Sequence, residues 1–349
     1  MSKYKVLLIS VVILGLMPFL HSGVGAQTTD TTVSNQADQA ISESAGLDDQ
    51  LEPLDDIQVD EAESIPSSFG FWWRNIREWT SLALTLDPVK KAEKQLKFAE
   101  ERTRLANYII QNSTDPKVQE KAQRMIEKAN QYMQRIEDKK DELAKRADEK
   151  SQKILDNIAK HNLNKQRVLE KIEDKLSPEK IEEFQQLRKA IEEKDKNFLE
   201  NLQNNPNIPQ EVKDRISNTM SRIQDMQKAR EELRVQQKDI LEAIKAGSQE
   251  AKDQFEKLRE ERKQNLEKIR EQFKEQKDEI INKIKAGDEN AVERLKELNQ
   301  RRQAEAEKMR EEIKQKATEM RNEMQQRKQE ELDKLRQLKE GTQNSDTDN

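Results

Sequence analysis

The side chains on which most enzyme chemistry relies are nearly absent from this chain. It contains no cysteine, and His161 is the only histidine after residue 21. A zinc site needs three or four Cys, His or carboxylate ligands that converge, and the sequence shows no such set around His161. Because His161 continues the apolar stripe of Ile158, we expect it at a helix seam or a helix end.

The many carboxylates have a simple interpretation as surface charges. They alternate with Lys and Arg at helical spacing, as in Glu256, Arg259, Glu260 and Lys263, which is typical of a solvated helix face with salt bridges. A catalytic acid pair needs an apolar pocket to separate two pKa values, and the eight glycines are scattered, so they form no phosphate loop. We therefore predict no enzyme, catalytic residue, cofactor, metal ion or small-molecule substrate. Since acidic and basic residues interleave, we also predict no nucleic acid partner.

One segment is a sharper candidate for a functional contact. All three tryptophans lie within residues 69–79, and spacings of four and three place Trp72, Ile76 and Trp79 on one helix face. The pattern favours packing of these side chains and Trp73 into the bundle as its largest apolar anchor. Contact with a membrane interface, where tryptophan is favoured, and docking of a protein partner are the alternatives. Trp72, Trp73, Ile76 and Trp79 are thus candidate partner or membrane contacts.

The N-terminus has the pattern of a secretory signal peptide over residues 1–26. Lys3 and Lys5 precede an apolar run at 6–20, and Val24-Gly25-Ala26 fits the small-residue cleavage rule. An uncleaved anchor is the alternative. Because no second apolar stretch has spanning length, we expect export to the periplasm, the cell surface or the extracellular medium.

Residues 27–66 differ in composition from the rest of the chain. They carry no Lys or Arg and many acidic residues, and Ser, Thr, Gln and Asn fill most of the remainder. Such a segment buries too little apolar surface to offset its ordering entropy. We predict a disordered acidic leader that acts as a solvated spacer; electrostatic docking onto the helical body is the alternative. A short disordered tail is expected at 341–349.

Residues 87–340 have the pattern of helix almost throughout. Capping side chains precede prolines at Asp87-Pro88, Asp115-Pro116 and Ser177-Pro178, an arrangement that suits helix starts. A linker rich in Asn and Pro divides a helical domain at 67–204 from a helical, coiled-coil-like region at 205–340. The predicted helices cover about 88–112, 116–176, 178–203, 209–246, 248–286 and 288–339, with a candidate break near 161–164.

Apolar residues recur along these helices at alternating spacings of four and three. One such seam is Ala92, Leu96, Ala99, Thr103, Ala106 and Ile110. With 33% hydrophobic and 38% charged residues, the composition suits narrow seams and not a wide core. We predict an all-α fold of long amphipathic helices that form an elongated, coiled-coil-like bundle or rod.

The C-terminal region contains an internal repeat. The segment at 240–247 recurs 40 residues later at 280–287, and both copies end in Lys-Ala-Gly, at Gly247 and Gly287. Such repetition indicates stacked helix-turn units. The sequence leaves open whether the two glycines reverse the chain or only kink a long rod.

Two resemblances follow from particular segments. Ser-Leu-Ala-Leu-Thr-Leu-Asp-Pro-Val-Lys-Lys-Ala-Glu at 81–93 and Phe-Ala-Glu-Glu-Arg at 98–102 resemble a secreted, all-helical bacterial domain of unknown function, over roughly residues 67–195. The likeness departs at Thr103-Arg104. It implies export and helical architecture, but no activity.

The second resemblance lies further along. Leu176-Ser177-Pro178-Glu179-Lys180 is similar to a motif of periplasmic helical chaperones and stress sensors, although Lys180 stands where that motif has Gln. A helix cap explains the segment equally well.

Three functional hypotheses remain open. The first is a cell-envelope helical scaffold or binding protein without catalytic activity, acting through self-association or a protein partner. The second is a periplasmic ATP-independent chaperone-like protein. The third is a peripheral membrane protein held by the tryptophan-rich helix.

Overall fold

The protein is all-α over the residues that the computed structural model describes, which are 40, 44, 50–146 and 148–345. Their helices are α2 (Ser68–Ala83), α3 (Pro88–Asn112), α4 (Pro116–Glu137), α5 (Lys140–Arg146), α6 (Glu149–Lys175), α7 (Pro178–Gln203), α8 (Gln210–Lys245), α9 (Gln249–Lys285) and α10 (Glu289–Ser345). The expected signal peptide at 1–26 lies outside the described residues, as does most of the acidic leader.

Local capping explains where several helices begin. The Asp87 carboxylate accepts a hydrogen bond from the Lys90 amide at 2.9 Å, and that of Asp115 accepts one from Lys117 at 2.9 Å. Each aspartate precedes a proline at the first helical position, as the sequence pattern predicts. Ser177 also precedes a helix that starts with proline, but its side chain makes no capping hydrogen bond.

The prediction of one continuous helix over 116–176 is wrong. It consists of α4, α5 and α6, with breaks after Glu137 and before Asp148, whose carboxylate caps α6 through the Ser151 amide at 2.7 Å. The predicted break near 161–164 does not occur, because these residues lie in the middle of α6. Polar side chains there bond to α3, so tertiary contacts sustain the helix.

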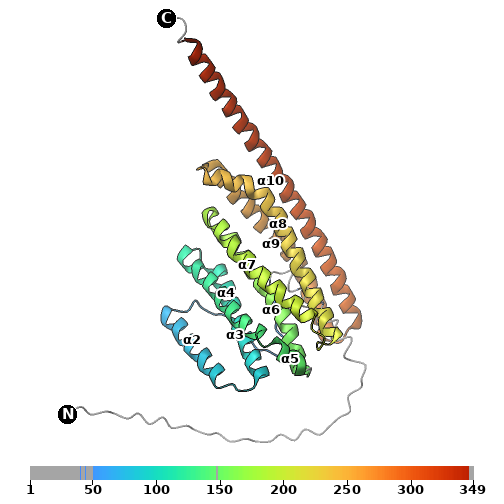
Figure 1. Cartoon of the computed structure of the whole chain (residues 1–349). Coiled ribbons are helices and arrows are strands. Elements are labelled where there is room, and N and C mark those ends of the chain that lie inside the picture. Colours follow the sequence, from blue (N-terminus) through green and yellow to red (C-terminus); the bar gives the residue numbers. More distant parts are fainter. Residues whose placement is uncertain (1–39, 41–43, 45–49, 147, 346–349) are drawn as a thin grey trace, which may run out of the picture.

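The helices form a layered bundle and not a uniform rod (Figure 1). α3 and α4 make a hairpin, and α6 lies centrally, in contact with α3, α4, α5, α7 and α8. The seam predicted on α3 is confirmed, since all six of its residues are buried. α10 has 57 residues, roughly 86 Å at 1.5 Å per residue, and its C-terminal end projects past the rest of the body (Figure 1).

Gly247 and Gly287 reverse the chain. Their φ values are +90° and +87°, in the left-handed region that glycine adopts without steric cost. The amide after each glycine bonds back to the helix, from Ser248 to Ala243 at 3.0 Å and from Asp288 to Lys283 at 3.0 Å. α9 therefore runs antiparallel to both α8 and α10, and it contacts each of them.

The segment at 50–66, here called the strap, lies extended on the helical body. Asn164 of α6 donates to the Glu52 carbonyl at 2.9 Å and accepts from its amide at 2.7 Å; Asn157 does the same with Asp55 at 2.8 and 2.7 Å. Leu54 and Ile57 join the apolar core. The predicted solvated spacer is therefore wrong for this part of the leader, because two amide side chains match the strap's backbone hydrogen-bonding groups.

Candidate functional site

The tryptophan-rich helix α2 packs on the body through its polar face. Glu78 is fully buried and accepts a hydrogen bond from Arg102 of α3 at 2.8 Å and from the Tyr132 hydroxyl of α4 at 2.6 Å. Arg74 donates to Glu101 of α3 at 2.8 Å. Leu82, one helical turn after Glu78 on the same face, is the buried apolar residue of α2.

The tryptophan side chains of α2 point to solvent. Trp72, Trp73 and Trp79 are 54%, 58% and 71% exposed, while Ile76 is half-buried. The predicted packing of these side chains into the core is therefore wrong. Its physical reason is that the stripe of Arg74 and Glu78 has the same helical spacing and finds charged partners on α3.

This surface extends beyond the four candidate residues. We call it the aromatic face, and it comprises Phe69, Trp72, Trp73, Ile76, Trp79, Leu84 and Leu86. The ring of Trp72 lies beside those of Phe69 and Trp73 in tilted arrangements, with ring centroids 5.5 and 6.2 Å apart. Leu84 and Leu86 are 78% and 93% exposed, so large apolar side chains are exposed both on α2 and in the loop that follows.

The charge around the aromatic face is one-sided. Glu78 is the only acidic residue between Ile65 and Leu86, and it is buried in its pair with Arg102. Arg77 and Lys90 are exposed, and no ion pair is found for either among the described residues. The face is thus apolar, and the nearest part-exposed carboxylate, Asp87, directly follows Leu86 and pairs with Arg146 at 3.3 Å.

His161 belongs to a polar cluster enclosed in the bundle. Its Nδ1 lies 2.8 Å from Glu100 of α3, which also accepts from Asn164 at 2.8 Å, and neither His161 nor Glu100 is exposed. The expected seam position of His161 is confirmed. The alternative, a helix end, is wrong, because His161 lies in the middle of α6. Within the described part of the chain, no three His, Cys, Asp or Glu residues are arranged to hold a metal ion.

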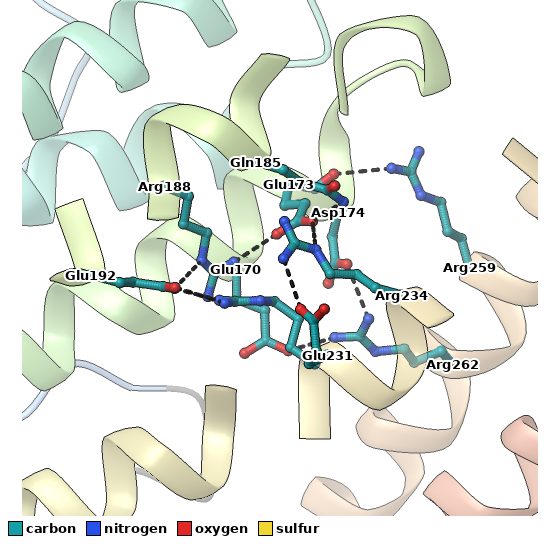
Figure 2. A network of polar contacts seen from close by, with 11 residues as sticks. Glu170, Glu173, Asp174, Gln185, Arg188, Glu192, Glu231, Arg234, Arg259 and Arg262 are labelled. Carbon is teal, nitrogen blue, oxygen red and sulfur yellow. Dashed lines mark hydrogen bonds and ion pairs between the residues drawn. The ribbon is translucent and has the colours of Figure 1, made fainter. Parts of the chain in front are cut away.

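A second charged cluster surrounds the C-terminal turn of α6 (Figure 2). Arg188 of α7 donates to Glu173 and Glu192, both at 2.8 Å, and Arg230 of α8 donates to both oxygens of Glu192 at 2.7 and 2.9 Å. Burial, then the neighbouring Arg230, lowers the pKa of Arg188. For Glu192, burial acts to raise the pKa, but the bonds and charges of Arg230 and Arg188 outweigh it and hold the pKa below its ordinary value.

Helix α9 contributes two further arginines to this cluster. Arg262 pairs with Glu170 at 2.7 Å and with Asp174 at 3.1 Å, and Arg259 donates to the Glu173 carbonyl at 3.0 Å. The cations lie where the negative end of the α6 dipole favours them. The cluster adjoins a cavity of about 720 Å³ that is lined by residues of α3, α4, α6, α7, α8, α9 and α10.

A family comparison finds a similarity that includes the tryptophan-rich helix. Residues 63–179 match the model of a family described as Domain of unknown function (DUF5667). This segment is similar to a DUF5667 domain. The resemblance predicted over roughly 67–195 is confirmed, and no curated protein and no solved structure matches the chain.

The segment at 63–179, which is similar to a DUF5667 domain, and the rest of the chain contribute differently to the two candidate sites. This segment supplies all of α2, its anchoring partners on α3 and α4, and the acidic end of α6. The cavity walls on α8, α9 and α10 lie outside it. Sequence reasoning missed the cavity because its arginines read as ordinary surface charges; the only available signal was that Arg230, Leu233 and Arg234 share one face of α8.

Proposed function

We propose that this protein is a non-catalytic binding protein of the cell envelope that attaches to an anionic membrane interface through the aromatic face of α2. The observation that supports this most is the inverted packing of α2, with Glu78 buried and all three tryptophans exposed. Several large apolar side chains exposed on one helix favour an interaction site. It refines the third hypothesis and keeps the exported, envelope setting of the first.

The composition of the face favours lipid as the occupant. Tryptophan is enriched at membrane–water interfaces because its ring is apolar and its N–H can remain hydrated. Arg77 and Lys90 can reach anionic headgroups while their stems stay with the apolar surface. Pairing with a second copy through this face would place Arg77 opposite a carboxylate, but the carboxylate nearest the face, Asp87, is already paired with Arg146.

The expected mode is peripheral and reversible. No helix in the described part of the chain is both long and apolar enough to cross a bilayer. Full burial of a large apolar side chain gains about 1.5–3 kcal/mol, so several partly inserted side chains give binding comparable to that of a single acyl chain. Such binding is marginal alone and strengthens with anionic lipid.

Vesicle binding tests this proposal directly. Intrinsic tryptophan fluorescence and co-sedimentation are measured with vesicles of phosphatidylcholine alone and with phosphatidylglycerol added. We expect blue-shifted emission and co-sedimentation that increase with the anionic fraction. The double variant Trp72→Ala/Trp79→Ala should lose co-sedimentation, while Trp73 remains as the fluorescent reporter.

The matched control removes apolar surface elsewhere. Val235→Ala on α8 shortens a side chain that is 60% exposed and should bind vesicles like the unaltered protein. Absence of any shift or co-sedimentation refutes membrane attachment. If the double variant instead dissociates an oligomer in lipid-free sedimentation velocity, the aromatic face pairs with a second copy.

A further inference from the structure

The helical body contacts the strap through a set of side chains on three helices. α6 contacts α3 and α8 directly, so the helices that carry these side chains are held together by contacts of their own. We call the set the strap site, and it comprises Arg104 of α3, Lys153, Asn157, Lys160, Asn164 and Arg167 of α6, and Arg222 of α8. Most of its members are Lys or Arg, whereas the strap has neither.

Two asparagines of the strap site bind main chain. Asn157 and Asn164 lie seven residues apart, on one face of α6, and each pairs with both the amide and the carbonyl of one strap residue, Asp55 and Glu52 respectively. Seven helical residues rise roughly 10.5 Å, and three residues of extended chain span about 10 Å. The spacing of the asparagines therefore fits an extended backbone that runs antiparallel to α6.

The strap site also selects acidic side chains. The Glu52 carboxylate is 1% exposed and accepts from Arg167 at 3.0 Å and from Arg222 at 2.5 Å. Lys160 donates to both oxygens of Asp55 at 2.7 and 2.8 Å. Because Arg167 is itself buried, removal of its carboxylate partner is costly. A segment that takes the place of the strap therefore needs an acidic residue at this point.

The residues after Glu52 complete a short recognition pattern. Leu54 and Ile57 are buried and join the apolar core. Between them the backbone turns at Asp56, whose φ of +56° is tolerated best by Gly, Asn and Asp, and Lys153 donates to its carboxylate at 2.6 Å. Pro53 is exposed, so its position can hold other residue types. The pattern is Glu-X-Leu-Asp-Asp-Ile.

We propose that the strap site binds an acidic, extended segment of a partner protein with this pattern, and that the strap is its exchangeable occupant within the chain. Main-chain hydrogen bonds combined with selected side-chain contacts are how proteins recognise extended peptides. Because the strap is tethered, it competes at an effective concentration of about millimolar. A partner therefore binds fully only when the strap is weakened or displaced. The proposal does not depend on membrane attachment.

A strap peptide added in trans tests the exchange. A synthetic peptide of residues 50–66, with fluorescein at its C-terminus, is titrated with the purified protein without lipid, and binding is followed by fluorescence anisotropy. The variant Glu52→Ala should bind this peptide at least about tenfold more tightly than the unaltered protein does. The reason is that its own strap lacks the buried ion pair, whereas the peptide retains it. A strap that is only structural would give no such gain.

Variants of the peptide test which features are recognised. A Glu52→Gln peptide should bind the Glu52→Ala protein at least about tenfold more weakly, because it lacks the charge that faces the two arginines. A peptide that keeps only residues 52 and 54–57, with serine elsewhere, should retain saturable binding. A scrambled peptide of the same composition should show none, which separates recognition from general charge attraction.

Variants of the strap site are made in the Glu52→Ala protein. Arg222→Gln and Asn157→Ala should each weaken binding of the 50–66 peptide at least about tenfold, because they remove a carboxylate contact and a main-chain contact. Lys228→Gln is the matched control, since it removes one positive charge at an exposed position of the same helix and should bind normally. Thermal unfolding by circular dichroism shows that each variant is folded.

Three results overturn the proposal. The first is that the Glu52→Ala protein binds the 50–66 peptide no better than the unaltered protein. The second is equal binding of the 50–66 and scrambled peptides. The third is a dimer of the unaltered protein in sedimentation velocity that Glu52→Ala dissociates, because the strap site would then hold the strap of a second copy. Trp72→Ala/Trp79→Ala in the Glu52→Ala protein should leave peptide binding unchanged, so this test is independent of vesicle binding.

Discussion

Glu78 of α2 and Arg102 of α3 form an ion pair enclosed by the protein. Their Oε2 and Nη2 atoms are 2.8 Å apart, and the two side chains are 0% and 1% exposed. Tyr132 donates to the same carboxylate oxygen, and its pKa is raised by burial and by that hydrogen bond. Because this pair occupies the inner face of α2, the tryptophans point outward.

Removal of the carboxylate should destabilise the protein strongly. Glu78→Ala leaves the Arg102 guanidinium buried without its main partner, and such a change costs about 3–5 kcal/mol. Urea unfolding followed by circular dichroism measures the loss. Glu127→Ala, an exposed position on α4, should change the free energy of unfolding by less than about 0.5 kcal/mol. A loss near that of the control would show that the pair does not anchor α2.

The tryptophans should matter little for stability. Trp72→Ala and Trp79→Ala remove side chains that are more than half exposed, so each should change the free energy of unfolding by less than about 0.5 kcal/mol. A buried tryptophan would cost about 3–5 kcal/mol. Urea unfolding of both variants therefore distinguishes an outward face from a core anchor, independently of any lipid measurement.

Helix ends were predictable because they depend on neighbouring residues. Asp87 before Pro88 and Asp115 before Pro116 are local capping signals, and both helices begin there. The glycines at the ends of α8 and α9 are also local signals, although only the structure shows that the chain reverses at them. The all-α class followed from periodicity, whereas the continuous rod was not confirmed.

The candidate sites depend on partners distant in sequence, which no local pattern reveals. Two stripes of α2 have helical spacing, and the choice between them rests on Arg102, 24 residues from Glu78. His161 and Asn164 read as helix-breaking polar residues until Glu100 is seen beside them. Glu52 bonds to Asn164 and Arg167, more than 110 residues away. Because these partners are so distant, the local composition of the strap predicted a solvated spacer.

The helix reversals should depend on glycine. Gly247→Ala and Gly287→Ala place a Cβ on backbone with φ of +90° and +87°, which costs roughly 1–2 kcal/mol for an L-residue. No atom lies within 4 Å of the added Cβ at either site, so the loss comes from the backbone conformation alone. Gly247→Asn should lose less than Gly247→Ala, because asparagine tolerates the left-handed region. If all three variants had the same free energy of unfolding in urea as the unaltered protein, this account would be contradicted.

The strap should be released by loss of a single carboxylate. Glu52 is buried and accepts from Arg167 at 3.0 Å and from Arg222 at 2.5 Å. Glu52→Ala should expose the strap to proteolysis, seen as faster cleavage within residues 50–66 by mass spectrometry. Glu63→Ala is the control, since that side chain is exposed and only the Glu63 carbonyl accepts a bond, from Tyr108. Equal cleavage rates would mean that backbone contacts with Asn157 and Asn164 suffice.

The ion pair between Asp195 and Lys165 should make stability depend on pH in an uncommon direction. The two side chains lie 2.7 Å apart, and burial raises the pKa of Asp195 above its ordinary value of 3.8 despite Lys165. The folded state therefore holds this proton more tightly than the unfolded state does. The stability due to this carboxyl is fully present below pH 3.8 and is lost as the pH rises through the raised pKa.

The variant Asp195→Asn cannot titrate at this position, so it should lack that loss. Lys165 keeps its hydrogen bond to Asn130 at 2.8 Å, and any constant cost of the substitution leaves the pH slope unchanged. Urea unfolding from pH 3 to neutrality should thus show the free-energy difference moving in favour of the variant as the pH rises. Asp225→Asn, an exposed position on α8, should follow the unaltered protein throughout. A difference that moves toward the unaltered protein instead would mean that Lys165 stabilises the ionised carboxylate enough to outweigh its burial.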